Sequence, residues 1–173
     1  MKKKKPIFYF EKFDTFDKWS LGGYVLITTA LFCFLKFAES DAYKFAFTTA
    51  YIYLTHLALN GVFYKSLRNM SVFTAWTAIG LLHLGISFYL NEDINLRLLI
   101  GPVLEPFKNT NLLLFVFQIL RIVSLKTQGK EMVGAPIKGS STDIFDEREV
   151  NFLDLVLYLI YLACFIVLDE PDL

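Results

Sequence analysis

The sequence has little of what usually holds a small soluble or secreted protein together. Only two cysteines, Cys33 and Cys164, occur in 173 residues, which excludes a disulfide scaffold. The 17 basic and 17 acidic residues cancel, so the chain lacks the basic excess of nucleic-acid-binding proteins. Because 55% of the residues are hydrophobic and only 20% are charged, the intrinsically disordered class is excluded as well.

Sequence motifs of well-known chemistry are also missing. The chain contains no glycine-rich phosphate loop, no HExxH pair and no nucleophile elbow. Its only histidines are His56 and His83, and a metal site would need further ligands that the sequence does not place beside them. We therefore expect a protein that is not an enzyme, that holds no cofactor or metal and that binds no nucleic acid.

Long apolar stretches dominate the sequence instead. At most one charged residue occurs in each of the stretches Trp19–Ala38, Tyr43–Tyr64, Ser71–Leu90 and Val150–Leu168. A helix of about 20 residues crosses the roughly 30 Å hydrocarbon core of a bilayer. Phe107–Leu125 is just long enough to be a further crossing. These patterns predict an all-α, polytopic integral membrane bundle of about five transmembrane helices, whereas a β-barrel would need short strands of alternating polarity.

The region before the fourth predicted crossing contains three helix-breaking residues, Gly101, Pro102 and Pro106. One helix from Ile94 to Leu125 would be about 48 Å long and would overshoot the bilayer. We therefore predict a kink here, with a short re-entrant or interfacial segment followed by the crossing at 107–125. Four crossings are the alternative.

Three further segments flank the membrane bundle predicted for residues 19–125. Residues 1–18 form a basic, aromatic segment that we expect at the membrane interface, with Tyr9, Phe13 and Phe16 on one helical face. Residues 126–149 are predicted to be a cytoplasmic loop in which the last helix begins near Asp143. Residues 150–173 comprise the last transmembrane helix and an acidic tail.

The basic residues predict the orientation. With five crossings, 13 of the 17 lysines and arginines lie on the side of the N-terminus. The other four are Lys36, Lys44, Arg97 and Lys108. The positive-inside rule therefore places the N-terminus in the cytoplasm of a multi-pass protein of the plasma or inner membrane.

Within each crossing, the few polar or small residues share one helical face. The residues predicted to turn toward a common interior are Thr49, Tyr53, His56, Asn60, Gly80, His83, Ser87, Gln118, Tyr158 and Tyr161. On the first helix the corresponding face contains Thr29, and on the fourth Asn111 lies in the same sector as Gln118. A neighbouring stripe of Ala42, Ala46 and Ala50 is predicted to pack closely against another helix. Arg121 and Asp154 are predicted to form an ion pair near the cytoplasmic membrane edge, because pairing offsets the cost of inserting both charges.

Three functions fit these features. The first is a non-enzymatic oligomeric subunit, a pore former, effector or scaffold, whose partners are the lipid bilayer and copies of itself or another membrane or cytoplasmic protein. The second is a small carrier or proton-coupled transporter with a tyrosine and histidine site at the membrane midplane, although the inverted repeats common in carriers are not apparent. The third is a haem- or quinone-binding redox subunit that uses the two histidines.

Overall fold

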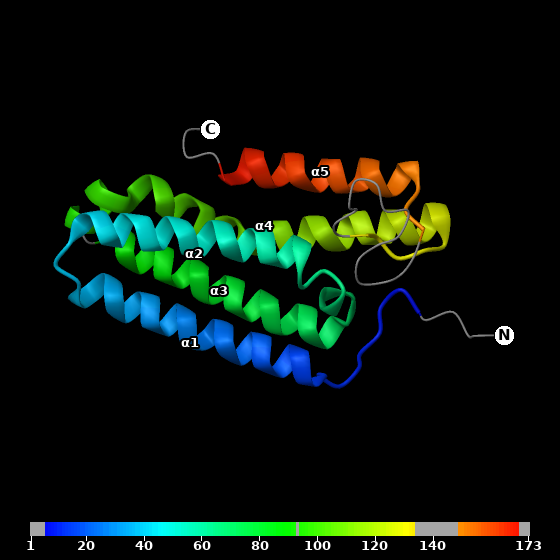
Figure 1. Cartoon of the computed structure of the whole chain (residues 1–173), viewed down its shortest axis with the longest axis horizontal. Helices are drawn as coiled ribbons and strands as arrows, with labels where there is room; N and C mark the ends of the chain where they lie inside the picture. Colours follow the sequence, from blue (N-terminus) through cyan, green and yellow to red (C-terminus); the bar gives the residue numbers. More distant parts are fainter. Residues whose placement is uncertain (1–5, 93, 134–148, 170–173) are drawn as a thin grey trace.

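The described residues form five α-helices and no β-strand, which confirms the all-helical class (Figure 1). The structure is a computed structural model that describes residues 6–92, 94–133 and 149–169, without the side chains of residues 91–105 and 169. The elements are α1 (Thr15–Phe37), α2 (Asp41–Gly61), a 3-10 turn η1 (Ser66–Arg68), α3 (Met70–Glu92), α4 (Ile94–Gln128) and α5 (Phe152–Asp169).

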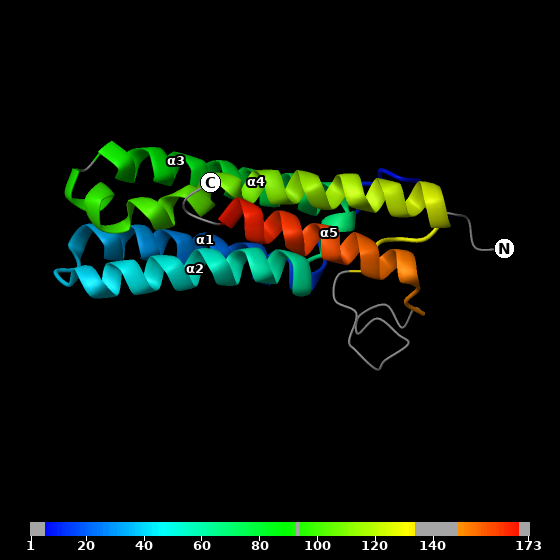
Figure 2. The ribbon, with the colours of Figure 1, turned by 90° about the horizontal axis from the view of Figure 1, so that it is seen from above.

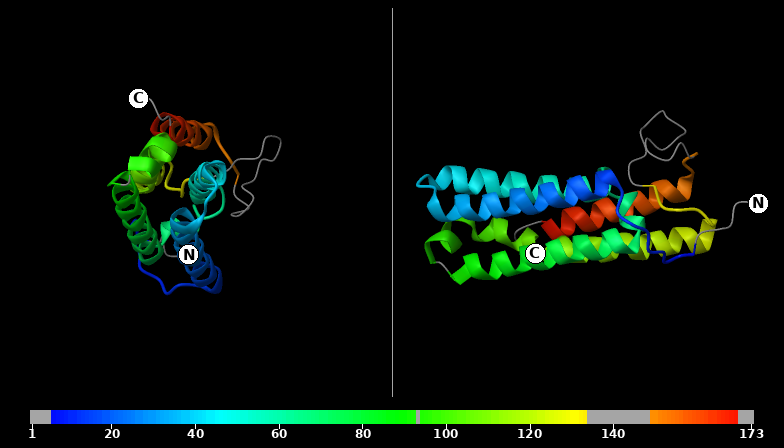
Figure 3. Two further views of the ribbon diagram at one scale, coloured as in Figure 1. Left: turned by 90° about the vertical axis from the view of Figure 1, so that its left-hand side faces the viewer. Right: turned by 90° about the horizontal axis from the view of Figure 1, so that it is seen from below.

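Consecutive helices run in opposite directions along one axis (Figures 1 and 2). α4 packs against α2, α3 and α5, whereas α1 packs only on α2 and α3 among the major helix contacts. Seen end-on, α1, α2, α4 and α3 surround the core and α5 lies outside α4 (Figure 3). We call the end that holds the start of α1, the α2–α3 connection, the end of α4 and the start of α5 the basic end, because Lys12, Lys18, Lys65, Lys126 and Lys130 lie there.

Three helical segments in the described part of the chain are long and apolar enough to cross a membrane. They are Thr15–Phe37, Met70–Leu90 and Pro106–Gln128. The apolar part of α5, Phe152–Leu168, is shorter than these. Large hydrophobic side chains such as Trp19, Phe37 and Phe152 are strongly exposed on the outside of the bundle. This composition is that of a multi-pass membrane protein.

The predicted division of this region into a separate re-entrant or interfacial segment and a crossing is wrong, whereas the kink at Gly101, Pro102 and Pro106 stays a prediction. α4 is one helix of 35 residues that continues through Gly101, Pro102 and Pro106. A helix can pass a proline when neighbouring groups satisfy the freed backbone carbonyl. At 1.5 Å per residue α4 is about 52 Å long. The side chain of Gln118 donates to the Leu67 carbonyl of the α2–α3 connection (2.7 Å), so ten further residues of α4 extend beyond that level.

The N-terminal segment is not an amphipathic helix, so the expected helical face of Tyr9, Phe13 and Phe16 is also wrong. α1 begins only at Thr15, where Asp14 accepts from the Asp17 N–H (2.6 Å) and Asp17 accepts from the Asp14 N–H (3.2 Å) in a reciprocal capping box. The preceding residues lie across the basic end instead. There Asn69 accepts from the Glu11 N–H and donates to the Glu11 carbonyl, both at 3.0 Å.

The last helix begins later than predicted. Its first residue is Phe152, and Asn151 accepts from the Asp154 N–H (2.9 Å) while Asp154 accepts from the Asn151 N–H (3.0 Å). This reciprocal cap satisfies two N–H groups that a helix start leaves unpaired. The expected start near Asp143 lies outside the described residues.

α3 and α4 approach closely at Gly80. A Cβ atom at this position would overlap the side-chain amide of Asn111. The Asn111 amide donates to the Thr77 carbonyl and accepts from the Leu81 N–H, both at 3.1 Å. The absence of a side chain at Gly80 therefore lets a polar side chain of α4 bond to the backbone of α3.

Substitution of Gly80 tests this contact. We expect Gly80→Ala to lower the free energy of unfolding by about 1–3 kcal/mol, because the Asn111 amide must leave its backbone partners. The matched control is Gly85→Ala on the same helix, where nothing lies within 4 Å of the added Cβ. Thermal unfolding in detergent should show a lower midpoint for the first variant and an unchanged or higher one for the second. Equal midpoints would contradict the contact.

Candidate functional site

The hydroxyl of Thr110 joins both histidines of the chain in the middle of the bundle. Nε2 of His56 and Nδ1 of His83 each lie 3.1 Å from Oγ1 of Thr110. All three side chains are fully buried. α2, α3 and α4 therefore meet at one oxygen atom, about 12 Å along α4 from Gln118 at the level of the α2–α3 connection.

The polar chain continues from His83 toward α1. Nε2 of His83 lies 2.7 Å from the Tyr51 hydroxyl, which also hydrogen-bonds the Thr28 hydroxyl. Thr28 in turn donates to the Tyr24 carbonyl (2.7 Å). We call the residues Thr28, Tyr51, His83, Thr110 and His56 the relay, because an unbroken series of hydrogen bonds links the four helices α1 to α4.

The relay can be polarised in two opposite directions. In one, the Thr28 hydroxyl turns from the Tyr24 carbonyl to donate to Tyr51, Tyr51 donates to Nε2 of His83, and Nδ1–H of His83 donates to Thr110. In the other, Thr110 donates to Nδ1, and Nε2–H donates to Tyr51, which then donates to Thr28. A neutral imidazole has one donor and one acceptor nitrogen, and a hydroxyl is both donor and acceptor. A change of His83 tautomer together with rotation of the hydroxyls therefore reverses the whole chain, which is the property needed to pass a proton along it.

Aromatic rings pack against three residues of the relay. Phe107 stacks on Tyr51 (5.9 Å between ring centroids) and meets His83 edge-on (5.4 Å). On the other side Phe165 meets His56 edge-on (6.2 Å). Between side chains that are buried in this way hydrogen bonds are strong, and breaking one leaves a buried polar group without a hydrogen-bond partner.

The structure separates the predicted interior residues into two sets. The fully or almost fully buried ones are His56, Asn60, Gly80, His83, Ser87, Gln118 and Tyr161. The half-buried ones are Thr49, Tyr53 and Tyr158. Tyr53 contacts the Phe165 ring edge-on (6.5 Å), and Thr49 donates to the Phe45 carbonyl (2.8 Å). Only two of the predicted residues, His56 and His83, belong to the relay.

Three relay residues, Thr28, Tyr51 and Thr110, were not predicted. The buried face of α2 contains Thr48, Ile52, Thr55 and Leu59, one position from the predicted face of Thr49 and Tyr53. On α1 the buried residue is likewise Thr28, next to the predicted Thr29. Tyr51 follows Thr48 by three residues and precedes Thr55 by four, and this spacing was the signal in the sequence that could have placed Tyr51 on the buried face.

The predicted close packing of Ala42, Ala46 and Ala50 against another helix is not found among the described residues. All three are exposed, and Ala50 lies on the wall of a groove between α1 and α2. No three His, Cys, Asp or Glu side chains converge as a metal site among the residues that the structure describes.

Arg121 does not pair with Asp154, which corrects the predicted ion pair. Its guanidinium donates to both carboxylate oxygens of Glu131 (2.7 and 2.8 Å) and to Oε1 of Gln118 (3.2 Å). The reason is a chain reversal: Gly129 has a φ of 65°, a left-handed conformation that favours glycine, and the chain after it returns alongside α4. Asp154 instead caps α5 and accepts from Nε2 of Gln128 (3.2 Å).

No protein-family model, curated protein or solved structure matches this chain.

A double-mutant cycle in detergent tests the two alternatives for Arg121. We expect Arg121→Met and Glu131→Gln to couple by about 1–3 kcal/mol, because each single change already removes the bidentate contact. Arg121→Met and Asp154→Asn should add to within about 0.5 kcal/mol, since the two residues share no partner. Coupling in the second pair but not in the first would restore the pairing predicted from the sequence.

Proposed function

We propose that the chain crosses the membrane five times with its N-terminus in the cytoplasm. The alternating directions of α1 to α5 and the gathering of lysines at the basic end support this topology. Ten residues of α4 extend beyond the α2–α3 connection. A helix of this length fits a bundle whose helices tilt relative to the bilayer.

We further propose that the protein transfers protons within the membrane, as the proton-handling part of a small carrier. The observation that carries this proposal is the relay, in which four helices contribute an unbroken series of buried or half-buried groups that can be polarised in either direction. A packing role alone would be met by apolar residues at lower cost of insertion, whereas ionisable groups inside a membrane mark proton pathways by default.

The relay favours this function over the two others. A pore lined by the polar faces of several subunits would need those faces on the outside, and His56, His83 and Gln118 are buried within one chain. Axial ligation of haem would need a ring nitrogen of each histidine, but both nitrogens of His83 are engaged by Tyr51 and Thr110.

Proton flux into proteoliposomes tests the proposal. With a potassium diffusion potential and a trapped pH-sensitive dye, we expect the purified protein to conduct protons and Tyr51→Phe to reduce the rate about a hundredfold, because the ring remains but the link between Thr28 and His83 is lost. The matched control is Tyr43→Phe at an exposed position of the same helix. Absence of flux, or an equal rate in the two variants, would refute the proposal.

A second candidate is a homo-oligomeric effector or scaffold subunit. The observation that favours it is the uncovered stripe of Ala42, Ala46 and Ala50, because small residues at a spacing of four let helices of two chains approach closely. The two candidates are compatible, since a relay inside each chain does not require a partner chain.

Native mass spectrometry tests the oligomer. We expect dimers or larger assemblies of the wild-type protein in mild detergent, and monomers for Ala46→Trp, because an indole at the centre of the stripe prevents close helix approach. Ala163→Trp, at an exposed alanine of α5, is the control and should leave the assembly intact. Monomers of the wild-type protein would exclude this candidate.

A further inference from the structure

A cavity of about 570 Å³ lies at the basic end, where α1 begins and the N-terminal segment crosses the α2–α3 connection. Its wall carries both signs of charge. The charged residues that line it are Glu11, Lys12, Asp14, Asp17, Lys65, Arg68 and Glu131. Glu131 is neutralised by Arg121, so no single sign dominates the remainder.

Asp17 gives this cavity a preference for a hydrogen-bond donor of positive charge. Its side chain is only 5% exposed, and one oxygen, Oδ2, accepts from the Asp14 N–H. Oδ1 is buried and has no hydrogen-bond partner among the described residues. A buried carboxylate oxygen without a donor is costly, and an ammonium group with N–H donors would satisfy both its charge and its lone pairs.

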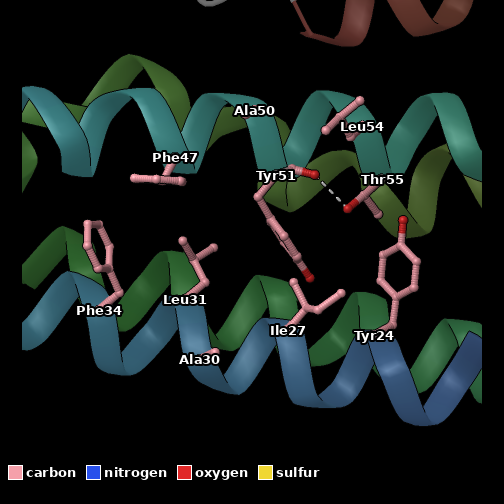
Figure 4. Close-up of a pocket in the computed structure, with 10 residues that line it drawn as sticks. All are labelled: Tyr24, Ile27, Ala30, Leu31, Phe34, Phe47, Ala50, Tyr51, Leu54 and Thr55. Atoms are coloured by element: carbon pink, nitrogen blue, oxygen red, sulfur yellow. Dashed lines mark hydrogen bonds between the residues drawn. The ribbon is translucent and has the colours of Figure 1, made fainter.

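An apolar groove of about 600 Å³ lies between α1 and α2, further along α1 than the cavity (Figure 4). Tyr24 and Thr55 line one end of it, and the rings of Phe34 and Phe47 meet edge-on at the other, 5.2 Å apart. From Tyr24 to Phe34 is about 15 Å of helix rise, which equals the depth of one leaflet of the hydrocarbon core. Ala30 and Ala50 are the small residues that leave the groove open.

The cavity and the groove follow one another along α1. Asp17 lines the first and Tyr24, two helical turns later, lines the second. Between them Phe63 contacts Phe16 (5.8 Å) and Tyr24 (5.6 Å edge-on). Trp19, 78% exposed, marks the membrane interface at this level of α1, as tryptophan does at bilayer boundaries.

We propose that this seam between α1 and α2 binds one zwitterionic phospholipid with a primary ammonium headgroup. The ammonium donates to Oδ1 of Asp17, the phosphate lies near the exposed ammonium groups of Lys12 and Lys65, and one acyl chain occupies the groove. A quaternary ammonium has no N–H to donate, and an anionic headgroup without an ammonium would bring no cation to the carboxylates. The charge pattern and the apolar groove therefore select an aminophospholipid over other bilayer lipids.

Lipid titration of the delipidated full-length protein, followed by native mass spectrometry, tests this inference. The probes are phospholipids with ethanolamine, choline and glycerol headgroups and identical acyl chains, together with free phosphoethanolamine. We expect ethanolamine lipid to bind at least about tenfold more tightly than the other two, the gain typical of one hydrogen bond to a charged group. Free phosphoethanolamine should bind far more weakly, because it lacks the acyl chain.

Two variants separate the contributions of the lipid headgroup and the acyl chain to binding. Asp17→Asn should remove the preference for ethanolamine lipid while keeping the helix cap, because the amide oxygen still accepts from the Asp14 N–H. Ala30→Phe should weaken binding of all three lipids by filling the groove. Asp41→Asn and Ala163→Phe are the charge-matched and size-matched controls and should bind as the wild-type protein does.

Three results would each overturn the inference: equal affinity for the three headgroups in the wild-type protein, an unchanged preference in Asp17→Asn, or unchanged binding in Ala30→Phe. Equally tight binding of free phosphoethanolamine would instead identify a soluble amine as the ligand and exclude the lipid. The outcome is independent of proton flux, since Asp17 and Ala30 are not part of the relay.

Discussion

The requirement that a polar atom inside an apolar bundle find its partner within the protein determines how these helices fit together. The Thr110 hydroxyl is the hydrogen-bond partner of both imidazoles, and these two bonds fix α4 against α2 and α3 at one depth. The same requirement is satisfied at Gly80, where the absence of a side chain lets the Asn111 amide hydrogen-bond to the backbone of α3. Hydrophobic association alone would leave the helices free to slide, because lipid solvates apolar side chains as well as a neighbouring helix does.

At the basic end the same requirement folds short segments back onto the bundle. The buried guanidinium of Arg121 is satisfied by Glu131 and Gln118, and its charged group lies over the Tyr9 ring at 5.7 Å. Arg68 donates to the Met132 carbonyl (2.7 Å) from the other side. The N-terminal segment and the residues after Gly129 are therefore held by the two buried arginines, and the cationic ends of both side chains remain within protein contacts.

Sequence reasoning could identify the helices, because apolar length is a local property of the chain, and it could identify His56, His83, Asn60 and Gln118 as inward-facing. It missed Thr28 because Thr29 lies one position away, and Tyr51 because Thr49 and Tyr53, two positions to either side, gave a regular stripe. Only the neighbouring helix decides between such faces. It paired Arg121 with Asp154 because it considered only partners that lie within predicted helices. Glu131 reaches Arg121 only through the left-handed turn at Gly129, and a reversal of that kind depends on tertiary contacts. The continuity of α4 through Pro102 and Pro106 was missed for the same reason, since local rules for proline do not include the neighbours that stabilise the helix.

The relay and the seam between α1 and α2 meet at Tyr51. Its ring lines the apolar groove, while its hydroxyl joins Thr28 of α1 to His83 of α3. α1 has few internal anchors, because only Asp17, Thr28, Leu31 and Leu35 are buried along it. The hydrogen bond between Thr28 and Tyr51 is therefore one of the few polar contacts that fix the position of α1 against α2, and it is made by the one relay residue whose ring also lines the groove.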